Sequence, residues 1–218
     1  MLFSLLILKI FVLRSLEAVT PARQYTAEIA PHAMTSWGVW GPEQFCPESS
    51  YVHGYQLRVE LDCFKHDGEH LRDCDDTALN AIRLFCAYHF DGMPDDLEAG
   101  YVESSSGPFG AWAEPIYCPG NGVFATGAQF RSEPDQGGSD DTAGNNLNME
   151  CTDGTILEGR GDPWGEWSSW VVCPKGTAVC GLKNLVEGDC YKHDGYDVKD
   201  CDDTAHNAVI FYCCDLPQ

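Results

Sequence analysis

The chain has 218 residues, of which 44% are hydrophobic, and its formal charge is −21 at pH 7. A charge of that sign and size repels phosphate backbones and anionic membranes, and it attracts basic proteins or divalent cations. We therefore expect no nucleic acid partner. The length suits one all-β domain with a single core, and 22 Gly with 12 Pro indicate many turns and few long helices.

At the N-terminus, residues 1–13 form an apolar stretch that is too short to span a bilayer but suits the core of a secretory signal peptide. We predict a signal peptide at residues 1–18, followed by a single domain at residues 19–218. No later stretch is long enough for a membrane span. Twelve cysteines form an even set that an oxidising compartment would convert to disulfides. The predicted location is the extracellular space or the extracellular matrix.

An internal repeat begins, in each of three copies, with a short strand and an aromatic–glycine motif. The short strands are expected at residues 25–29, 101–104 and 155–158. The motif Trp-Gly-Val-Trp at residues 37–40 recurs as Phe-Gly-Ala-Trp at 109–112 and as Trp-Gly-Glu-Trp at 164–167. A Cys-Pro pair follows each motif, at Cys46, Cys118 and Cys173. The three copies span about residues 25–86, 101–151 and 155–214.

Each copy continues with a strand-like run that starts at a glycine and ends at a glutamate. The glutamates are Glu60, Glu133 and Glu187. The first run alternates apolar and polar residues, as a half-buried strand does. In the third copy, Asn184 and Leu185 stand at the positions of Leu57 and Arg58. This break in the alternation predicts a β-bulge in the third copy.

An acidic motif, Asp-Asp-Thr-Ala-x-Asn, follows in every copy. It occupies residues 75–80, 140–145 and 202–207, and the strand after it ends at Cys86, Cys151 or Cys213. Asp, Thr and Asn side chains bond nearby backbone amides in turns. The motif is therefore expected to lock a turn.

These segments give about four strands per copy. Few residues follow the third copy, so the first strand of the chain is expected to complete the last sheet and close the structure with threefold symmetry. Three four-stranded antiparallel sheets around a pseudo-threefold axis would cover one another's apolar faces, with the aromatic–glycine pairs near the shared interior. The predicted architecture is a disulfide-bonded, all-β prism.

The three motifs, repeated three times in one order, resemble the vitelline membrane outer layer protein family over about residues 25–214. The resemblance implies a β-prism of three Greek-key units in an extracellular protein of the kind first known from an egg coat. It implies a secreted structural or interaction protein of an extracellular coat or secretion. We expect a monomer whose partners are basic extracellular proteins or matrix glycans.

The matching places of the cysteines in the repeat predict the disulfides Cys46–Cys86, Cys118–Cys151 and Cys173–Cys213. The remaining pairs are Cys180–Cys214, Cys63–Cys74 and Cys190–Cys201, of which the last two share a spacing of 11 and close Lys-His-Asp loops that copy two lacks. Cys213 and Cys214 point to opposite faces of an extended strand, so which of them pairs with Cys173 stays open.

A zinc site at Cys63, His66 and Cys74, with His193 repeating the pattern, is the alternative use of these loops. Export and the even cysteine count favour disulfides instead. We therefore predict no metal and no cofactor.

The carboxylates suggest an enzyme as an alternative function, because two carboxylates about 5 to 10 Å apart can cleave or transfer a glycosidic bond. The family resemblance includes a link to chitooligosaccharide transfer. The residues that could line a shared polar cavity are Glu60, Asp76, Glu133, Asp141, Glu187 and Asp203. Catalysis needs one asymmetric site, whereas these residues recur in every copy, so we assign no catalytic residue.

The second hypothesis is accordingly a carbohydrate-active or glycan-binding protein that acts on N-acetylglucosamine oligomers. Exposed tryptophans beside carboxylates could stack on sugar rings. The periodic placement of the tryptophans favours core packing over stacking. The chain contains no Gly-x-Ser-x-Gly or His-Glu-x-x-His motif, which argues against hydrolases of those types.

Overall fold

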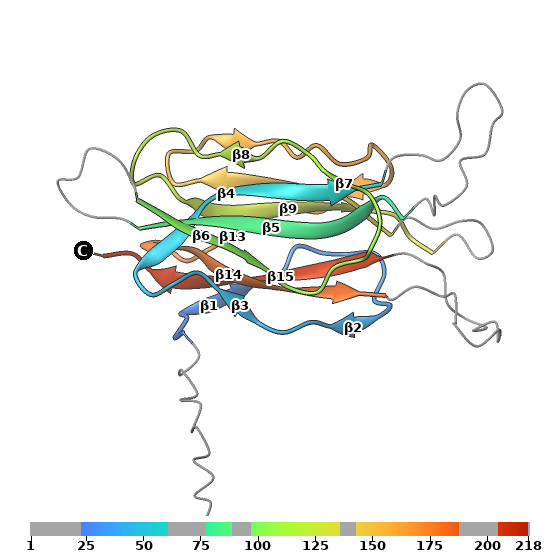
Figure 1. The fold of residues 1–218 in the computed structure, drawn as a ribbon, viewed down its shortest axis with the longest axis horizontal. Helices are drawn as coiled ribbons and strands as arrows, with labels where there is room; N and C mark the ends of the chain where they lie inside the picture. Colours follow the sequence, from blue (N-terminus) through green and yellow to red (C-terminus); the bar gives the residue numbers. More distant parts are fainter. Residues whose placement is uncertain (1–22, 61–76, 89–96, 136–142, 188–204, 218) are drawn as a thin grey trace, which may run out of the picture.

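The structure is a computed structural model, and it describes residues 23–60, 77–88, 97–135, 143–187 and 205–217. These residues form three antiparallel sheets arranged as a prism (Figure 1). They contain no helix that is long and apolar enough to cross a membrane. The all-β prediction is confirmed. The predicted signal peptide lies outside the described residues.

Each sheet is built around one long hairpin. Sheet I contains β4 (Ser50–Val59), β5 (Leu79–Tyr88), β6 (Leu97–Glu103), β7 (Ala111–Trp112) and β8 (Ile116–Tyr117). Sheet II contains β9 (Ala125–Ser132), β10 (Gly144–Cys151), β11 (Ile156–Leu157), β12 (Glu166–Trp167) and β13 (Val171–Val172). Sheet III contains β14 (Thr177–Val186), β15 (His206–Asp215), β1 (Ala27–Ile29), β2 (Val39–Trp40) and β3 (Gln44–Phe45).

The strand order within each sheet is that of a Greek key. In sheet I the order is β6-β5-β4-β7, and β8 also pairs with β4. The segments β7 and β8 lie one after the other along the same edge of β4, so they form one interrupted strand. Three strands joined in sequence, with a fourth that returns beside the first, define the Greek key. The predicted four-stranded Greek-key sheets are confirmed.

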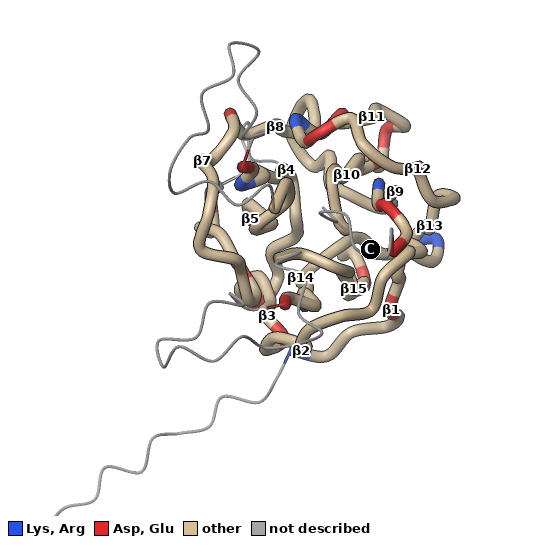
Figure 2. Tube along the Cα trace, turned by 90° about the vertical axis from the view of Figure 1, so that its right-hand side faces the viewer, with Lys and Arg blue, Asp and Glu red and all other residues tan. Residues whose placement is uncertain are grey.

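Every repeat lends its first strands to the sheet of the preceding repeat, and the N-terminal strands complete sheet III. Ala27 pairs with Cys213, and the backbone N–H of Thr26 donates to the Cys213 carbonyl at 2.7 Å. On the other side of the sheet, β2 and β3 pair with β14. Figure 2, seen along the prism, shows the three sheets around a common axis. The predicted threefold closure is confirmed.

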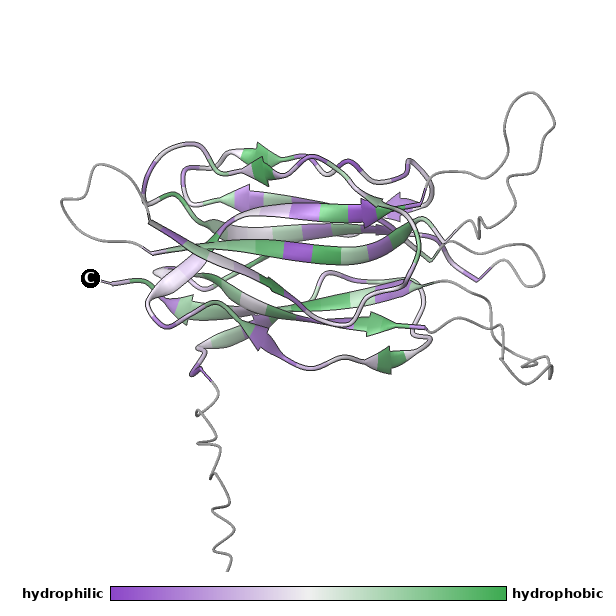
Figure 3. Ribbon diagram, in the orientation of Figure 1, coloured by the Kyte–Doolittle hydropathy of each residue, from purple (hydrophilic) through white to green (hydrophobic). Residues whose placement is uncertain are grey.

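The core lies between the three sheets. Its side chains come from alternate positions of the long hairpins, such as Ile82, Leu84 and Cys86 of β5, a strand that is mostly hydrophobic (Figure 3). The innermost residues include Leu57, Ile82, Phe130, Leu147, Leu182 and Phe211, all at most 2% exposed. Such alternation places every second side chain on the buried face of a strand. The hairpins therefore supply the hydrophobic stabilisation of the prism.

The prediction that the aromatic–glycine motifs pack in the interior is wrong. Trp40 is 42% exposed and Trp164 is 49% exposed, and no tryptophan of the described residues belongs to the buried core. The motif instead crosses over the end of a neighbouring hairpin. A Cβ on Gly110 would lie 2.4 Å from the backbone of Val59, and its φ is +76°, so only glycine fits there without strain. The glycine is the structural part of the motif, and the second tryptophan lies on the outer face.

Three disulfides join the three sheets in a ring. Cys46–Cys86 joins sheet III to sheet I, Cys118–Cys151 joins sheet I to sheet II, and Cys173–Cys213 joins sheet II to sheet III. A fourth bridge, Cys180–Cys214, lies within the hairpin of β14 and β15. Cys213 is thus the partner of Cys173. The predicted pairs Cys63–Cys74 and Cys190–Cys201 lie outside the described residues.

Tyr55 crosses the core from sheet I to sheet II. Its hydroxyl is buried and donates to the carbonyls of Leu147 at 2.7 Å and Leu157 at 3.1 Å. Replacing Tyr55 by phenylalanine leaves both carbonyls without this donor and is expected to lower the free energy of unfolding by about 1 to 2 kcal/mol. Urea unfolding monitored by tryptophan fluorescence measures the change. A loss below about 0.3 kcal/mol would show that the bond between the sheets contributes nothing.

Candidate functional site

The predicted acidic residues lie at one end of the prism. Glu60, Glu133 and Glu187 directly follow β4, β9 and β14, and these strands end on the same side of the molecule (Figure 1). Asp76, Asp141 and Asp203 lie outside the described residues. The structure therefore places one glutamate at the same end of each sheet.

Each of these glutamates is fixed by its own backbone to the acidic motif across the hairpin. The N–H groups of Glu60, Glu133 and Glu187 donate to the carbonyls of Ala78, Ala143 and Ala205, each at 2.8 Å. The three alanines have φ angles of +49°, +47° and +49°. Residues other than glycine rarely adopt this left-handed conformation. We call this arrangement of glutamate and left-handed alanine a corner, and it occurs once in each sheet.

In the first corner the side chains add a chain of hydrogen bonds. Thr77 Oγ1 donates to Glu60 Oε2 at 2.9 Å, and Asn80 Nδ2 donates to Thr77 Oγ1 at 2.6 Å. Glu60 is 9% exposed, and Thr77 and Asn80 are buried. The Glu60 carboxylate is therefore held inside a turn, as expected for a turn lock.

The asparagine of the motif is the extra residue of a β-bulge. Arg58 pairs with Ala81 while Val59 pairs with Leu79, so Asn80 has no partner across the ladder. The same register shift leaves out Asn145 in sheet II and Asn207 in sheet III. The bulge predicted at Asn184 and Leu185 is not found, because β14 pairs there in regular register with β15. The bulge lies on β15, at Asn207, and its equivalent recurs in all three sheets. Its cause is the acidic motif, since the motif is common to every copy.

Neighbouring corners pack against each other at this end of the prism, since a Cβ on Gly144 of the second corner would lie 2.3 Å from the His206 carbonyl oxygen beside the third. A Cβ on Gly107 would lie 2.3 Å from Asn80 Oδ1 and 2.9 Å from the Ala205 methyl group, so this loop packs between two corners. The variable position of the acidic motif is Leu79, Gly144 or His206, all buried. This end of the prism is consequently filled by backbone and by buried side chains, Leu79 and His206 among them.

His206 occupies that position in sheet III with no exposed surface. Its ring centroid lies 5.8 Å from that of Phe130, and neither ring nitrogen has a hydrogen-bond partner among the described residues. Desolvation by burial lowers the pKa of His206 to about 3, because the charged form loses its hydration. The side chain is therefore neutral at physiological pH.

Two cavities are lined by residues other than the corner glutamates. One has a volume of about 460 Å³ and opens on the outer face of sheet III beside Leu185 and Trp40. The other has a volume of about 290 Å³ and is lined by Arg23, Tyr51 and Asp215 among others. Neither cavity is lined by Glu60, Glu133 or Glu187, so the glutamates do not face one another across either of them.

In the second cavity, Arg23 holds the start of the described chain against the loop before β4. Arg23 NH1 donates to the carbonyls of Cys46, Pro47 and Ser50 at 2.6 to 3.1 Å. Tyr51 donates its hydroxyl proton to the Asp215 carbonyl at 2.5 Å. These contacts tie both ends of the described chain to the start of β4 and the loop before it. Within the described residues, no group of three or more His, Cys, Asp or Glu side chains could hold a metal ion.

The outer face of sheet I carries a row of aromatic side chains that sequence reasoning missed. The Phe85 ring lies 6.4 Å from the Tyr101 ring and 5.3 Å from the Tyr117 ring, measured between centroids. Tyr101 is 58% exposed and Tyr117 is 42% exposed. Gly54 makes the row continuous, because a Cβ there would lie 2.4 Å from Tyr117 Cδ1. The glycine of the strand-like run was the available signal, since it marks a close approach.

The guanidinium of Arg83 extends this row. It lies 4.3 Å from the Tyr101 ring centroid and 4.0 Å from that of Trp112, and it forms an ion pair with Glu103. The equivalent row in sheet II is Ile156, Glu150 and Val172. The aromatic row is thus a property of sheet I that sheet II lacks.

Comparison with known proteins places this geometry in context. A model of the vitelline membrane outer layer protein I family matches residues 27–216. The vitelline membrane outer layer protein 1 homolog of Mus musculus is 37% identical over 180 residues, which are 82% of this chain and 79% of that protein. The homolog of Homo sapiens is 36% identical over 191 residues, which are 87% of this chain and 84% of that protein.

Among solved structures, Calystegia sepium agglutinin superposes on this chain with a TM-score of 0.52 at 8% identity, covering 89% of this chain and 99% of that one. A single chain recombinant jacalin gives a TM-score of 0.49 at 9% identity, covering 90% of this chain and 98% of that one. At these identities the likeness concerns the fold alone.

Proposed function

The chain belongs to the vitelline membrane outer layer protein I family, and we propose that it serves as a secreted structural and interaction protein of an extracellular coat or secretion. The names of its relatives refer to the outer layer of a vitelline membrane. Export by a signal peptide at residues 1–18, and a monomeric single domain at residues 19–218, are part of the proposal.

The observation that carries this proposal is the use of the glutamates in the corners. Each of Glu60, Glu133 and Glu187 bonds a left-handed alanine through its backbone, and the Glu60 carboxylate accepts a bond from buried Thr77. A glycosidase needs two carboxylates on either side of one bond. Three glutamates anchored alike by their backbones, one of them with its carboxylate bonded inside the turn, serve the fold instead, so a structural role accounts for them better than catalysis does.

A charge of −21 on a compact prism favours basic partners, because the summed field attracts cations over about a Debye length of 10 Å at moderate salt. Cytochrome c is a suitable basic probe, and its succinylated, acidic form is the matched control. We expect binding of cytochrome c that weakens steeply between 20 and 200 mM salt, on the order of tenfold or more, and no binding of the succinylated form. Equal binding of both forms would refute charge-based interaction.

Export is tested separately by expressing the full chain in secretory cells. We expect the protein in the medium, with its N-terminus at or near residue 19, as read by mass spectrometry of the intact protein. Retention inside the cells with residue 1 in place would contradict the proposal.

The aromatic row of sheet I favours a second function, the binding of N-acetylglucosamine oligomers. Tyr101, Phe85 and Tyr117 present three adjacent rings with an ion pair beside them, and sugar rings bind to aromatic faces through their C–H groups. The Arg83–Glu103 pair cancels its own charge, which suits an uncharged glycan better than a charged one.

A double variant, Y101A/Y117A, tests this second function by titration with chitohexaose followed by NMR. The wild type is expected to bind, and the variant is expected to bind at least about tenfold more weakly because two stacking rings are lost. The double variant I156A/V172A changes the equivalent positions of sheet II and should retain binding. Chitohexaose that binds neither protein, or binds Y101A/Y117A normally, would remove this function.

A further inference from the structure

The threefold repeat places an arginine beside a tryptophan on the outer faces of sheets I and II. Arg58 lies opposite Ala81 on one side and Trp112 on the other. Arg131 holds the same place between Asn146 and Trp167. In sheet III this place, between Ala208 and Trp40, belongs to Leu185. Leu185 is therefore the structural equivalent of two arginines.

Both arginines bind the loop that precedes the neighbouring tryptophan. Arg58 donates to the carbonyls of Gly107 at 3.4 Å and Gly110 at 3.2 Å, and also to that of Pro108. Arg131 Nε donates to the Gly165 carbonyl at 3.0 Å, and its guanidinium carbon lies 5.6 Å from the Trp167 ring centroid. A guanidinium thus fits between this loop and the sheet.

Leu185 cannot donate hydrogen bonds, and the cavity of about 460 Å³ lies beside it. Its lining includes Thr35, Ser36 and Gly38. Counted back from the tryptophan of the motif, these positions match Gly107, Pro108 and Gly110, whose carbonyls bind Arg58. The cavity therefore corresponds to the space that an arginine side chain fills in sheet I.

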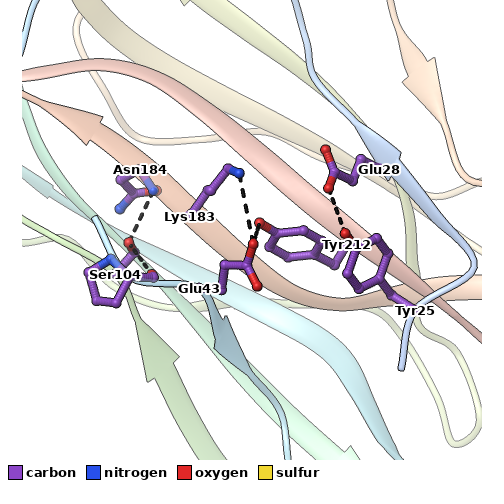
Figure 4. Close-up of polar contacts among 8 residues, drawn as sticks. Tyr25, Glu28, Glu43, Ser104, Lys183, Asn184 and Tyr212 are labelled. Carbon is purple, nitrogen blue, oxygen red and sulfur yellow. Dashed lines mark hydrogen bonds and ion pairs between the residues drawn. The ribbon is translucent and has the colours of Figure 1, made fainter. Parts of the chain in front are cut away.

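Two further features suit a cationic occupant. Thr35 is 8% exposed, lines the cavity, and its Oγ1 has no hydrogen-bond partner among the described residues. Trp40 is 42% exposed at the cavity edge. The nearest described cation, Lys183, lies 5.5 Å from the Trp40 ring centroid and is paired with Glu43 at 3.9 Å (Figure 4). Its charge is therefore partly neutralised.

We propose that the cavity beside Leu185 binds an arginine side chain of a basic partner protein. The planar guanidinium presents several donors in one plane, as Arg58 does toward three carbonyls, and it stacks on indole faces. A lysine ammonium is a compact, strongly hydrated charge whose three donors leave from a single nitrogen, so it cannot match carbonyls spaced along a loop as a planar guanidinium does. This inference rests on the proposed function, since it specifies how a basic partner is recognised.

The variant L185R tests the inference, because its own side chain can fill the cavity as Arg58 fills the matching space. The control V39R adds the same charge at a residue that is 76% exposed and does not line the cavity. The probes are protamine, which is rich in arginine, and poly-L-lysine of similar charge. Binding is measured by isothermal titration calorimetry at one fixed salt concentration, and the thermal unfolding of each variant shows that it folds.

We expect L185R to bind protamine about tenfold more weakly than V39R does, and both variants to bind poly-L-lysine equally. Nα-acetyl-arginine amide should shift the NMR signal of the Trp40 indole N–H in the wild type and leave it unchanged in L185R. Equal protamine binding by L185R and V39R would overturn the arginine site and leave the proposed function intact. Failure of the wild type to bind either polycation would overturn both.

Discussion

Lowering the pH from 7 to 4 is expected to destabilise the wild-type protein by about 3 kcal/mol more than it destabilises the variant H206L. Burial lowers the pKa of His206 to about 3, whereas an unfolded histidine titrates near 6.5. Between these values the unfolded chain binds a proton that the folded chain does not. Stability from neutral His206 is therefore present above about pH 6.5 and is lost as the pH falls toward 3.

Urea unfolding at several pH values between 4 and 7.5 measures this difference. Leucine is a suitable replacement, because the equivalent position of sheet I is Leu79, which is also fully buried. The control variant H32Q changes an exposed histidine in the loop after β1 and should keep the acid sensitivity of the wild type. If H206L and the wild type lose stability in parallel, His206 is not buried in its neutral form.

Removing the Cys118–Cys151 bridge is expected to cost about 3 to 4 kcal/mol of unfolding free energy. The bridge closes 33 residues of sequence, and in the loop-closure account a loop of this length contributes about that amount. Within the described residues, this bridge is also the disulfide that links sheet I to sheet II. The variant C118S/C151S is expected to stay folded, because the core of all three sheets remains, but to unfold at lower denaturant concentration.

The variant C180S/C214S is the control, since that bridge spans 34 residues but lies within one hairpin. Guanidinium unfolding of both variants measures the midpoint and the slope. Equal losses support the loop-closure account. A loss below about 1 kcal/mol in C118S/C151S would show that the sheets are held together without the ring of disulfides.

Much of the fold could be predicted from sequence because the patterns that specify it are short, involve residues close together in the chain, and recur in each copy. The alternation in the run before Glu60 identified β4, and the recurrence of three motifs identified three sheets. Matching cysteine positions predicted the pairs that are found in the four described bridges, while the choice between Cys213 and Cys214 as the partner of Cys173 was open until the structure showed Cys213. These predictions succeeded because a repeat converts one local pattern into three independent observations.

The placement of the tryptophans could not be predicted in the same way. Periodicity shows that Trp40, Trp112 and Trp167 are equivalent, but it does not show which face of a sheet they occupy. Their face depends on the pairing of short strands with a hairpin from another repeat, which is a contact distant in sequence. The aromatic row of sheet I was missed for the same reason, since Phe85, Tyr101 and Tyr117 come from three separate strands.

Leu185 shows a second limit of sequence reasoning. The substitution of leucine for arginine was visible in the repeat and was interpreted as a sign of a local bulge. The structure shows no bulge at Leu185, and the bulge opposite it, at Asn207, has an equivalent in all three sheets, so it explains nothing particular to Leu185. Its consequence, a cavity against the loop at Thr35, Ser36 and Gly38, depends on the hydrogen bonds that Arg58 makes elsewhere. Only the structure connects these residues.

Amide hydrogen exchange of the N-terminal strands tests threefold closure most directly, and the equivalence of Leu185 with Arg58 and Arg131 rests on that closure. If β1 and β3 complete sheet III, the amides of Thr26 and Cys46, which flank these strands, should be protected to a degree similar to those of β15, because they donate to the carbonyls of Cys213 in β15 and Cys180 in β14. Exchange of these two amides at the rate of an unstructured peptide, with β14 and β15 still protected, would contradict the closed prism.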